Sequence, residues 1–376
     1  MNETDITPEL SIIAWEITRR CMMDCRHCRA GEKPASAEHE LSTRECLLLV
    51  DDIASFASPV VMITGGEPML RDDLPEIVHY LSGKGIGTTL SPCGPLVTAD
   101  ALFALKDAGL GYISFSIDAI DPAAHDSFRR YPGAFASVLN GVDAAKKAGL
   151  PFAILTTVTR HNVNDLPRII RFAGDLGAAF FIPFFLVATG KGKTIRHHQL
   201  SPAAYEACLS WLYDRSTGRH MLPAGSDMVI RPGCAPHFYR IVHRREGSYK
   251  LSFFDTPITD GCLAGISFLF ISFSGIVQPC GYLDLPCGDV RREPLHTIWK
   301  TSPVFQNIRN PHAYQGKCGV CEFLSVCRGC RARAHAESGN YMHEDPFCSH
   351  CPAPPAMPRQ VTEIIMKTTW CPPSRV

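Results

Sequence analysis

Eight residues, Cys21-Met22-Met23-Asp24-Cys25-Arg26-His27-Cys28, carry three thiols separated by three and then two residues. They follow an apolar, β-branched run, residues 11–18, which predicts a buried first strand. A structural zinc site usually brings four ligands in two pairs, whereas this segment offers three. Three thiolates on a 4Fe-4S cluster leave one iron open for a small molecule, while ferredoxin runs supply a fourth cysteine. The segment therefore predicts a cluster with one exchangeable position; three unrelated buried thiols are the alternative.

The composition is that of a packed globular chain without bulk charge. The 376 residues carry 37 basic and 37 acidic side chains, which argues against nucleic acid as an electrostatic partner. A hydrophobic content of 45% fits a folded protein. No apolar run approaches the ~20 residues that span a bilayer, and the N-terminus shows no export signal. We expect a cytoplasmic protein without a membrane span.

The 17 cysteines gather toward the two ends of the chain. Three lie within residues 21–28, and nine lie between Cys262 and Cys351. In a reducing compartment, such clusters indicate metal binding rather than disulfides. We therefore expect two metal-binding regions with a scaffold between them.

The scaffold shows six alternations of a short apolar strand with a helix. This pattern is typical of a parallel sheet covered by helices. No GxGxxG motif follows a strand, which disfavours a Rossmann sheet. We predict an α/β fold: a partial (β/α)6 barrel over residues 1–217, followed by a small cysteine-rich domain. The expected strands are 11–18, 59–64, 85–91, 110–117, 152–159 and 178–186, and the expected helices are 42–56, 72–82, 98–108, 134–148, 164–176 and 201–213.

A second motif, Gly65-Gly66-Glu67-Pro68, follows the second expected strand. Active sites of barrels lie at the carboxyl ends of the strands, so this turn and the cysteine loop should be neighbours. The glycine pair allows a ligand to approach the backbone closely. Glu67 supplies an acceptor suited to an ammonium group. Alone the motif is an ordinary turn, but after the cysteine loop it indicates a binding site.

Together these motifs resemble the signature of the radical S-adenosylmethionine (SAM) enzymes. In that family, the amino and carboxylate groups of SAM chelate the open iron. The resemblance implies that Cys21, Cys25 and Cys28 hold the cluster. It also implies that Gly65, Gly66 and Glu67 hold the amino group of SAM.

The segment Ser114-Phe115-Ser116-Ile117-Asp118 resembles the family's strand near the SAM ribose. Ser116 and Asp118 alternate onto one side of the strand, so both are candidate SAM contacts, although a strand-end cap explains them equally well. Arg129 is a candidate for the SAM carboxylate, with a solvated helix charge as the alternative.

Residues 218–261 lack clear periodicity, and we interpret them as a connector that covers the barrel mouth. Its basic and aromatic residues Arg231, His237, Tyr239 and Arg240 are candidates for an anionic, partly aromatic substrate, because arginine recognises carboxylates in a bidentate manner. A solvated surface loop is the alternative. The tail, residues 352–376, is rich in proline and is expected to be extended.

The cysteine-rich region, residues 262–351, resembles the SPASM extension of radical SAM maturases. The resemblance rests on Cys262-x12-Gly275-x4-Cys280 and on a later Cx2Cx5C run. One auxiliary 4Fe-4S cluster is assigned to Cys318, Cys321, Cys327 and Cys348. Possible ligands of a second are Cys262, Cys280 and Cys330, with the fourth unknown. The family has three residues between its third and fourth thiols, whereas this chain has two between Cys327 and Cys330. This departure leaves the number of auxiliary clusters open at one or two. Zinc is the alternative metal.

Several short segments are similar to the radical SAM heme synthases of the siroheme-dependent pathway: residues 14–21, 91–94, 234–240, 316–321 and 330–334. This resemblance implies oxidative decarboxylation of two propionates of Fe-coproporphyrin III to vinyl groups, giving protoheme for heme b biosynthesis. It implies an iron porphyrin substrate and an external low-potential electron donor.

Three alternatives stay open. One is a related tetrapyrrole enzyme acting on siroheme derivatives or in heme d1 synthesis. Another is a SPASM peptide maturase, although the ~20 residues before Cys21 leave no room for the peptide-binding domain that often precedes that motif. The third is a non-enzymatic iron-sulfur electron carrier or zinc scaffold, which gives the Gly65-Gly66-Glu67 turn no purpose.

Overall fold

The computed structural model describes residues 8–31, 36–217, 227–246, 251–253, 256–258 and 261–352. Six consecutive strands pair in parallel and in chain order, which confirms the predicted partial barrel. Each strand is short and largely buried, as the apolar runs require. The strands are β1 (Ile12–Glu16), β2 (Val60–Thr64), β3 (Thr88–Leu90), β4 (Tyr112–Ser116), β5 (Phe152–Val158) and β6 (Phe180–Phe185).

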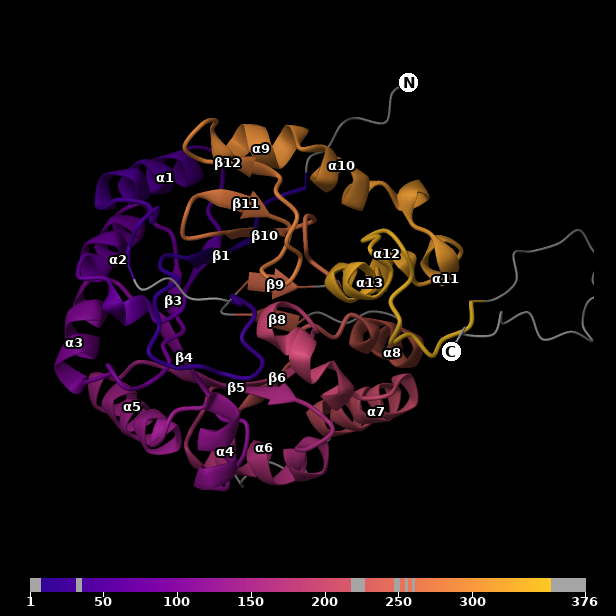
Figure 1. The fold of residues 1–376 in the computed structure, drawn as a ribbon, viewed down its shortest axis with the longest axis horizontal. Coiled ribbons are helices and arrows are strands. Elements are labelled where there is room, and N and C mark those ends of the chain that lie inside the picture. Colours follow the sequence, from indigo (N-terminus) through magenta and orange to yellow (C-terminus); the bar gives the residue numbers. More distant parts are fainter. Residues whose placement is uncertain are drawn as a thin grey trace, which may run out of the picture.

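Helices cover the outer face of these strands (Figure 1). The first begins at a capping box, in which Ser42 and Glu45 satisfy each other's backbone N–H groups. One short helix, α4, was not predicted, because its polar sequence shows little apolar periodicity. The helices are α1 (Thr43–Phe56), α2 (Leu74–Gly83), α3 (Ala99–Asp107), α4 (Pro122–Arg129), α5 (Ala134–Ala148), α6 (Leu166–Asp175) and α7 (Pro202–Thr217), with 3-10 turns η1 (Pro68–Leu70), η2 (Val163–Asp165) and η3 (Gly190–His198).

The sheet continues beyond the six strands at both edges. Strand β7 (Val229–Ile230) pairs in parallel with β6. At the other edge, β10 (Phe268–Ile271) pairs in parallel with β1, so that Ile12 faces Phe268. Strands β11 (Ile276–Gln278) and β12 (Gly288–Asp289) follow in antiparallel order. The region predicted as a separate domain from residue 262 therefore supplies three strands to the barrel sheet.

The connector is not an irregular loop. It contains β7 and the helix α8 (His237–Glu246), and residues 218–226 lie outside the described part. The first six residues of α8 are buried, and its last four, residues 243–246, are exposed. A small hairpin follows, formed by β8 (Leu251–Phe253) and β9 (Thr256–Ile258).

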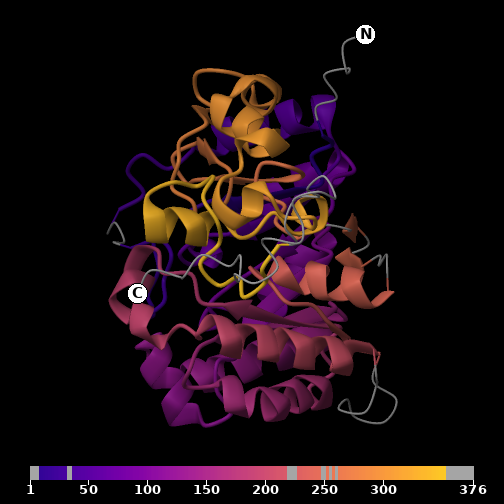
Figure 2. The ribbon, with the colours of Figure 1, turned by 90° about the vertical axis from the view of Figure 1, so that its right-hand side faces the viewer.

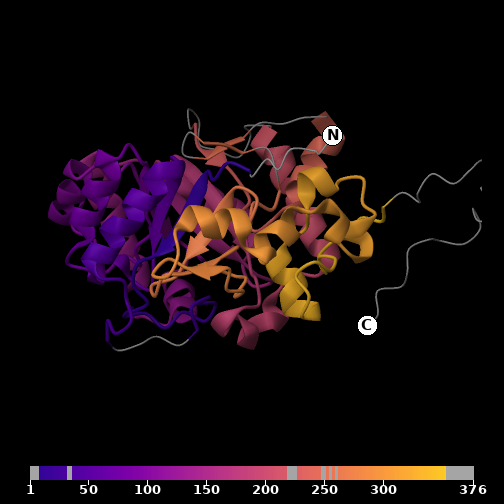
Figure 3. The ribbon, with the colours of Figure 1, turned by 90° about the horizontal axis from the view of Figure 1, so that it is seen from above.

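Helices α11, α12 and α13 lie across the molecule from α2 and α3 (Figures 1 and 3), on the side that faces the viewer in Figure 2. Helix α9 contacts α1, and α12 contacts α8. The predicted extended tail lies outside the described residues except for Pro352. Within the described residues, no helix is long and apolar enough to cross a membrane. The elements are α9 (Leu295–Thr301), α10 (Pro303–Arg309), η4 (Pro311–Ala313), α11 (Gly316–Gly319), α12 (Leu324–Cys327) and α13 (Arg331–Ser338).

Candidate functional site

The cysteine loop lies at the carboxyl end of β1. Cys25 is buried, while Cys21 and Cys28 are half-buried and pack in the same cluster. Backbone hydrogen bonds hold this loop from two sides. The N–H of Arg26 donates to the Phe128 carbonyl (3.1 Å), and the N–H of Lys191 donates to the Cys28 carbonyl (2.9 Å). The three thiols thus converge at the predicted end of the barrel, and an all-thiol donor set fits an iron-sulfur cluster.

The Gly65-Gly66 turn contacts the cysteine loop directly. The N–H of Gly66 donates to the Thr18 carbonyl (2.7 Å), and that of Glu67 donates to the Arg20 carbonyl (2.7 Å). A Cβ on Gly66 would lie 2.2 Å from the Arg20 oxygen. The glycines are therefore needed to seat the turn against the loop, a role that the sequence analysis did not foresee. Their contact with SAM stays a prediction.

Glu67 is fully buried and fixes a third segment, the loop that carries Cys93. One carboxylate oxygen accepts the N–H of Met69 (2.9 Å), and the other accepts the N–H of Cys93 (2.6 Å). Burial raises the pKa of Glu67 to about 7, although both donors act in the opposite direction. Sequence reasoning missed Cys93 as a site residue. Its sulfur lies 3.6 Å from that of Cys21, so a fourth thiol adjoins the three predicted ones.

Asp118 and Arg129 form a buried ion pair beside the cysteine loop. Both Nε and Nη2 of Arg129 lie 2.7 Å from Oδ2 of Asp118, and Oδ1 accepts the N–H of Thr157 (2.8 Å). Burial alone would raise the pKa of Asp118, but the guanidinium holds it below its ordinary value. Ser116 is half-buried at the end of β4. The predicted SAM contacts of these residues stay predictions, since Arg129 already neutralises Asp118.

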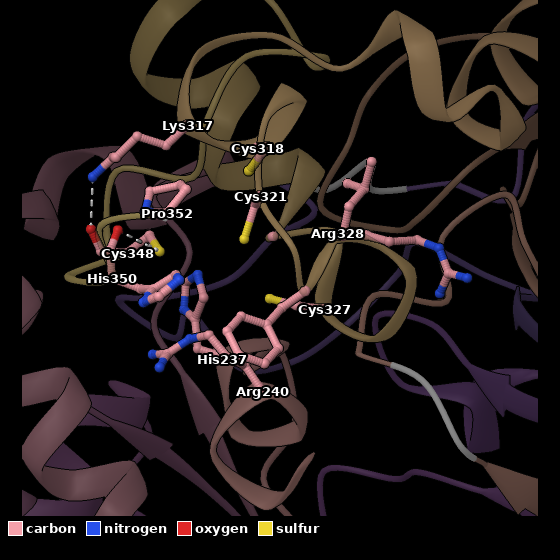
Figure 4. Close-up of a pocket in the computed structure, with 13 residues that line it drawn as sticks. His237, Arg240, Lys317, Cys318, Cys321, Cys327, Arg328, Cys348, His350 and Pro352 are labelled. Atoms are coloured by element: carbon pink, nitrogen blue, oxygen red, sulfur yellow. Dashed lines mark hydrogen bonds between the residues drawn. The ribbon is translucent and has the colours of Figure 1, made fainter. Parts of the chain in front are cut away.

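The four thiols assigned to an auxiliary cluster line one pocket (Figure 4). They come from α11, the turn between α11 and α12, the end of α12 and the segment that follows α13: Cys318, Cys321, Cys327 and Cys348. Near them, donor atoms of Cys321, Glu322 and His350 lie within 4.8 Å of one another, a possible metal-binding group. That group shares the Cys321 thiol, so it is an alternative use of the same place and not a separate site.

A second group of thiols contains the residue that the sequence left unidentified. Cys234 and Cys280 pack against the buried Cys330. Burial raises the pKa of the Cys234 thiol, and Cys330, Cys280 and Cys262 raise it further. Cys234 therefore completes a set of four thiols with the three predicted ones. Its position in the chain gave no signal, because it stands 28 residues before Cys262 without a paired cysteine.

The predicted substrate residues lie inside the protein and not on a loop over the barrel mouth. Arg240 donates to Glu206 (2.5 Å), and the Arg231 guanidinium donates to the Tyr239 hydroxyl (3.2 Å). His237 is 1% exposed, and its Nε2 lies 3.7 Å from Asp345. His237 and Arg240 line the auxiliary pocket (Figure 4). Their burial contradicts the alternative of a solvated surface loop, and their contact with a substrate stays a prediction.

Comparisons with known proteins agree with this geometry. The chain matches the Radical SAM superfamily over residues 15–173 and the SPASM iron-sulfur cluster-binding domain over residues 262–331. It is 41% identical over 354 residues to the AdoMet-dependent heme synthase of Oleidesulfovibrio alaskensis, covering 93% of this chain and 89% of the relative. The AdoMet-dependent heme synthase of Methanosarcina barkeri is 38% identical over 347 residues, which cover 91% of this chain and 97% of the relative.

A solved structure, native anSMEcpe with bound AdoMet, has the same fold, with a TM-score of 0.69 at 17% identity over 90% of this chain and 94% of that chain. The radical SAM domain implies a 4Fe-4S cluster and SAM, and the SPASM domain implies auxiliary iron-sulfur binding. The chain belongs to the radical SAM enzymes and, within them, to the family of AdoMet-dependent heme synthases.

Proposed function

We propose that this enzyme converts two propionate side chains of Fe-coproporphyrin III into vinyl groups, giving protoheme. The observation that carries the proposal is the likeness, over more than nine-tenths of the chain, to relatives named AdoMet-dependent heme synthase. Each conversion removes one carboxyl group as CO2 and one hydrogen from the propionate β-carbon. The porphyrin keeps its iron and its remaining side chains.

Each group of thiols has a separate role in this proposal. Cys21, Cys25 and Cys28 hold a cluster whose open iron binds SAM. When bound, cluster and SAM supply one-electron reduction and hydrogen-atom abstraction. The buried Asp118–Arg129 pair and the Gly65-Gly66 turn keep the cysteine loop in place. The second thiol group (Cys234, Cys262, Cys280 and Cys330) and the third (Cys318, Cys321, Cys327 and Cys348) offer an exit for the electron released with CO2.

Mass spectrometry of an anaerobic assay tests the proposal. The reconstituted, chemically reduced protein receives SAM and, in separate reactions, Fe-coproporphyrin III, a siroheme derivative or a heme d1 precursor. We expect 5′-deoxyadenosine together with porphyrins that have lost one and then two carboxyl groups. Conversion of only the other tetrapyrroles would contradict the proposal and favour the rival tetrapyrrole reaction.

A Cys25→Ala variant is the control for the cofactor assignment. It removes one of three cluster thiols, so we expect it to form no 5′-deoxyadenosine. A Cys208→Ala variant is the matched control, because that buried thiol lies on α7, away from all three thiol groups. We also propose an external low-potential donor as the physiological reductant, to be replaced by dithionite in this assay.

A further inference from the structure

Arg29 lies between the first thiol group and the second. It directly follows Cys28 in the chain. A Cβ built on Gly281, the neighbour of Cys280, would lie 3.4 Å from the Cδ of Arg29. The backbone at Arg29 is fixed, because Gly190 packs on the carbonyls of Cys28 and Arg29 and could not carry a side chain there. Arg29 thus lies beside Cys28 on one side and beside the Cys280–Gly281 segment on the other.

Arg29 shares its carboxylate partner with a second arginine. Glu16 is fully buried at the end of β1, with Arg19 at 3.0 Å from one carboxylate oxygen and Arg29 at 3.3 Å from the other. Arg29 also lies over the ring of Phe270 (4.5 Å), and Arg19 over that of Phe273 (4.5 Å). Two guanidinium groups thus share one carboxylate.

Hydrogen-bond donors are also left over in this cluster. Nη2 of Arg29 is the nitrogen that faces Glu16 Oε1 at 3.3 Å, without a well-aligned hydrogen bond, and Nε of Arg19 is buried and makes none within the described part of the chain. A buried guanidinium with unused N–H groups favours a carboxylate that can accept from two of them. Arg240 differs in its ion pair, because it contacts Glu206 without a competing arginine, whereas Arg29 shares Glu16 with Arg19.

Tyr282 supplies a second donor at the same place. Its backbone N–H donates to the Cys280 sulfur (3.4 Å), and it packs with Cys234 and Cys280. Its hydroxyl makes no hydrogen bond to any residue that the structure describes.

We propose that Arg29, oriented by Glu16 and assisted by the Tyr282 hydroxyl, binds a carboxylate of the substrate between the two thiol groups. This inference rests on the proposed function, because it takes the substrate to be a carboxylated porphyrin. It replaces the residues of α8 as the predicted recognition site. The same contact selects for substrates that still carry the carboxylate.

Absorbance titration of the cluster-loaded protein with Fe-coproporphyrin III tests this site without requiring turnover. We expect Arg29→Gln to weaken binding about 10- to 100-fold, as for a lost charge-assisted hydrogen bond. Arg29→Lys should fall between that variant and the native protein, since lysine keeps the charge but loses the bidentate geometry. Arg168→Gln is the matched control, because that arginine is 72% exposed on the outer helix α6, and it should bind as the native protein does.

The tetramethyl ester of the same porphyrin separates carboxylate recognition from general packing. Its affinity should be the same for the native protein and Arg29→Gln. Tyr282→Phe should weaken binding of the free acid about 3- to 10-fold, as for a lost neutral hydrogen bond. This second variant tests the carboxylate site if Arg29→Gln does not retain its iron. Native affinity in both variants, with native turnover intact, would overturn this site and leave the proposed function standing. Failure of the native protein to bind any carboxylated porphyrin would overturn both.

Discussion

Asp118 shows at the scale of one residue how the site depends on buried charge. Its only buried counter-charge within hydrogen-bond distance, among the described residues, is Arg129. We expect Arg129→Met to lower the free energy of unfolding by about 3–5 kcal/mol, because it leaves a carboxylate buried without its partner. Arg168→Met should change it by less than ~0.5 kcal/mol, since that exposed pair contributes little. Urea denaturation measures both; equal stability of the two variants would contradict the assigned role.

Glu67 offers a second residue-scale prediction. Its carboxylate accepts two backbone N–H groups, one on each oxygen, whereas a glutamine side chain has a single acceptor oxygen. We expect Glu67→Gln to cost about 1–3 kcal/mol of unfolding free energy, because one buried N–H then faces an amide NH2 group. Glu76→Gln is the control, as Glu76 is exposed on α2. No loss of stability in Glu67→Gln would show that the two hydrogen bonds are dispensable.

At the scale of one element, the Gly65-Gly66 turn ties β2 to the cysteine loop. A Gly66→Ala substitution should push the Arg20 carbonyl away, because a Cβ would lie 2.2 Å from its oxygen. We expect reduced iron per chain after reconstitution. The control is Gly83→Ala near the end of α2, where a Cβ meets nothing within 4 Å. Iron content that is native in both variants would mean that the turn does not position the loop.

An ion pair at the start of α1 makes the stability of the protein depend on pH. Arg291 donates to Glu45 (2.7 Å), and this pair joins α1 to the segment after β12. The hydrogen bond from Arg291 and those within the Ser42 cap lower the pKa of Glu45 to about 2. The carboxylate's contribution to stability is therefore complete above the unfolded-state value of ~4.3 and is lost as the pH falls toward 2.

Comparison of the native protein with Glu45→Gln checks the direction of this pH dependence of stability. Glutamine can still form the capping box, so only the screened ion pair is removed. The native protein should be more stable by at most ~1 kcal/mol at pH 6. The difference should shrink between pH 4.5 and pH 3. A difference that grows on acidification would contradict the assignment.

The same elements show what the sequence can and cannot predict. Apolar strands alternating with capped helices predict the six β/α units, since those signals are local. Helix α8 escaped prediction because its arginine and histidine side chains were interpreted as those of an irregular basic segment. The fourth thiol, Cys234, escaped because only the folded chain brings it to Cys280 and Cys330. Arg29 looked like an ordinary loop residue, and its unused donors become visible only beside Glu16 and Phe270.

At the scale of the whole molecule, one sheet carries both iron-sulfur regions. Cys280 follows β11, which runs antiparallel to β10 in the sheet that also contains β1. Gly281, the neighbour of Cys280, packs on Arg29, the neighbour of Cys28, so the two regions are in contact. The division at residue 262 is thus a division of motifs along one sheet.

One assay tests the proposed reaction directly. Anaerobic, reduced protein with intact clusters is given SAM and Fe-coproporphyrin III, and the porphyrins are followed by mass spectrometry over time. The account predicts a product that has lost one carboxyl group and one β-hydrogen, followed by a second that has lost two of each, with 5′-deoxyadenosine formed in step. SAM cleavage with the porphyrin mass unchanged would contradict it.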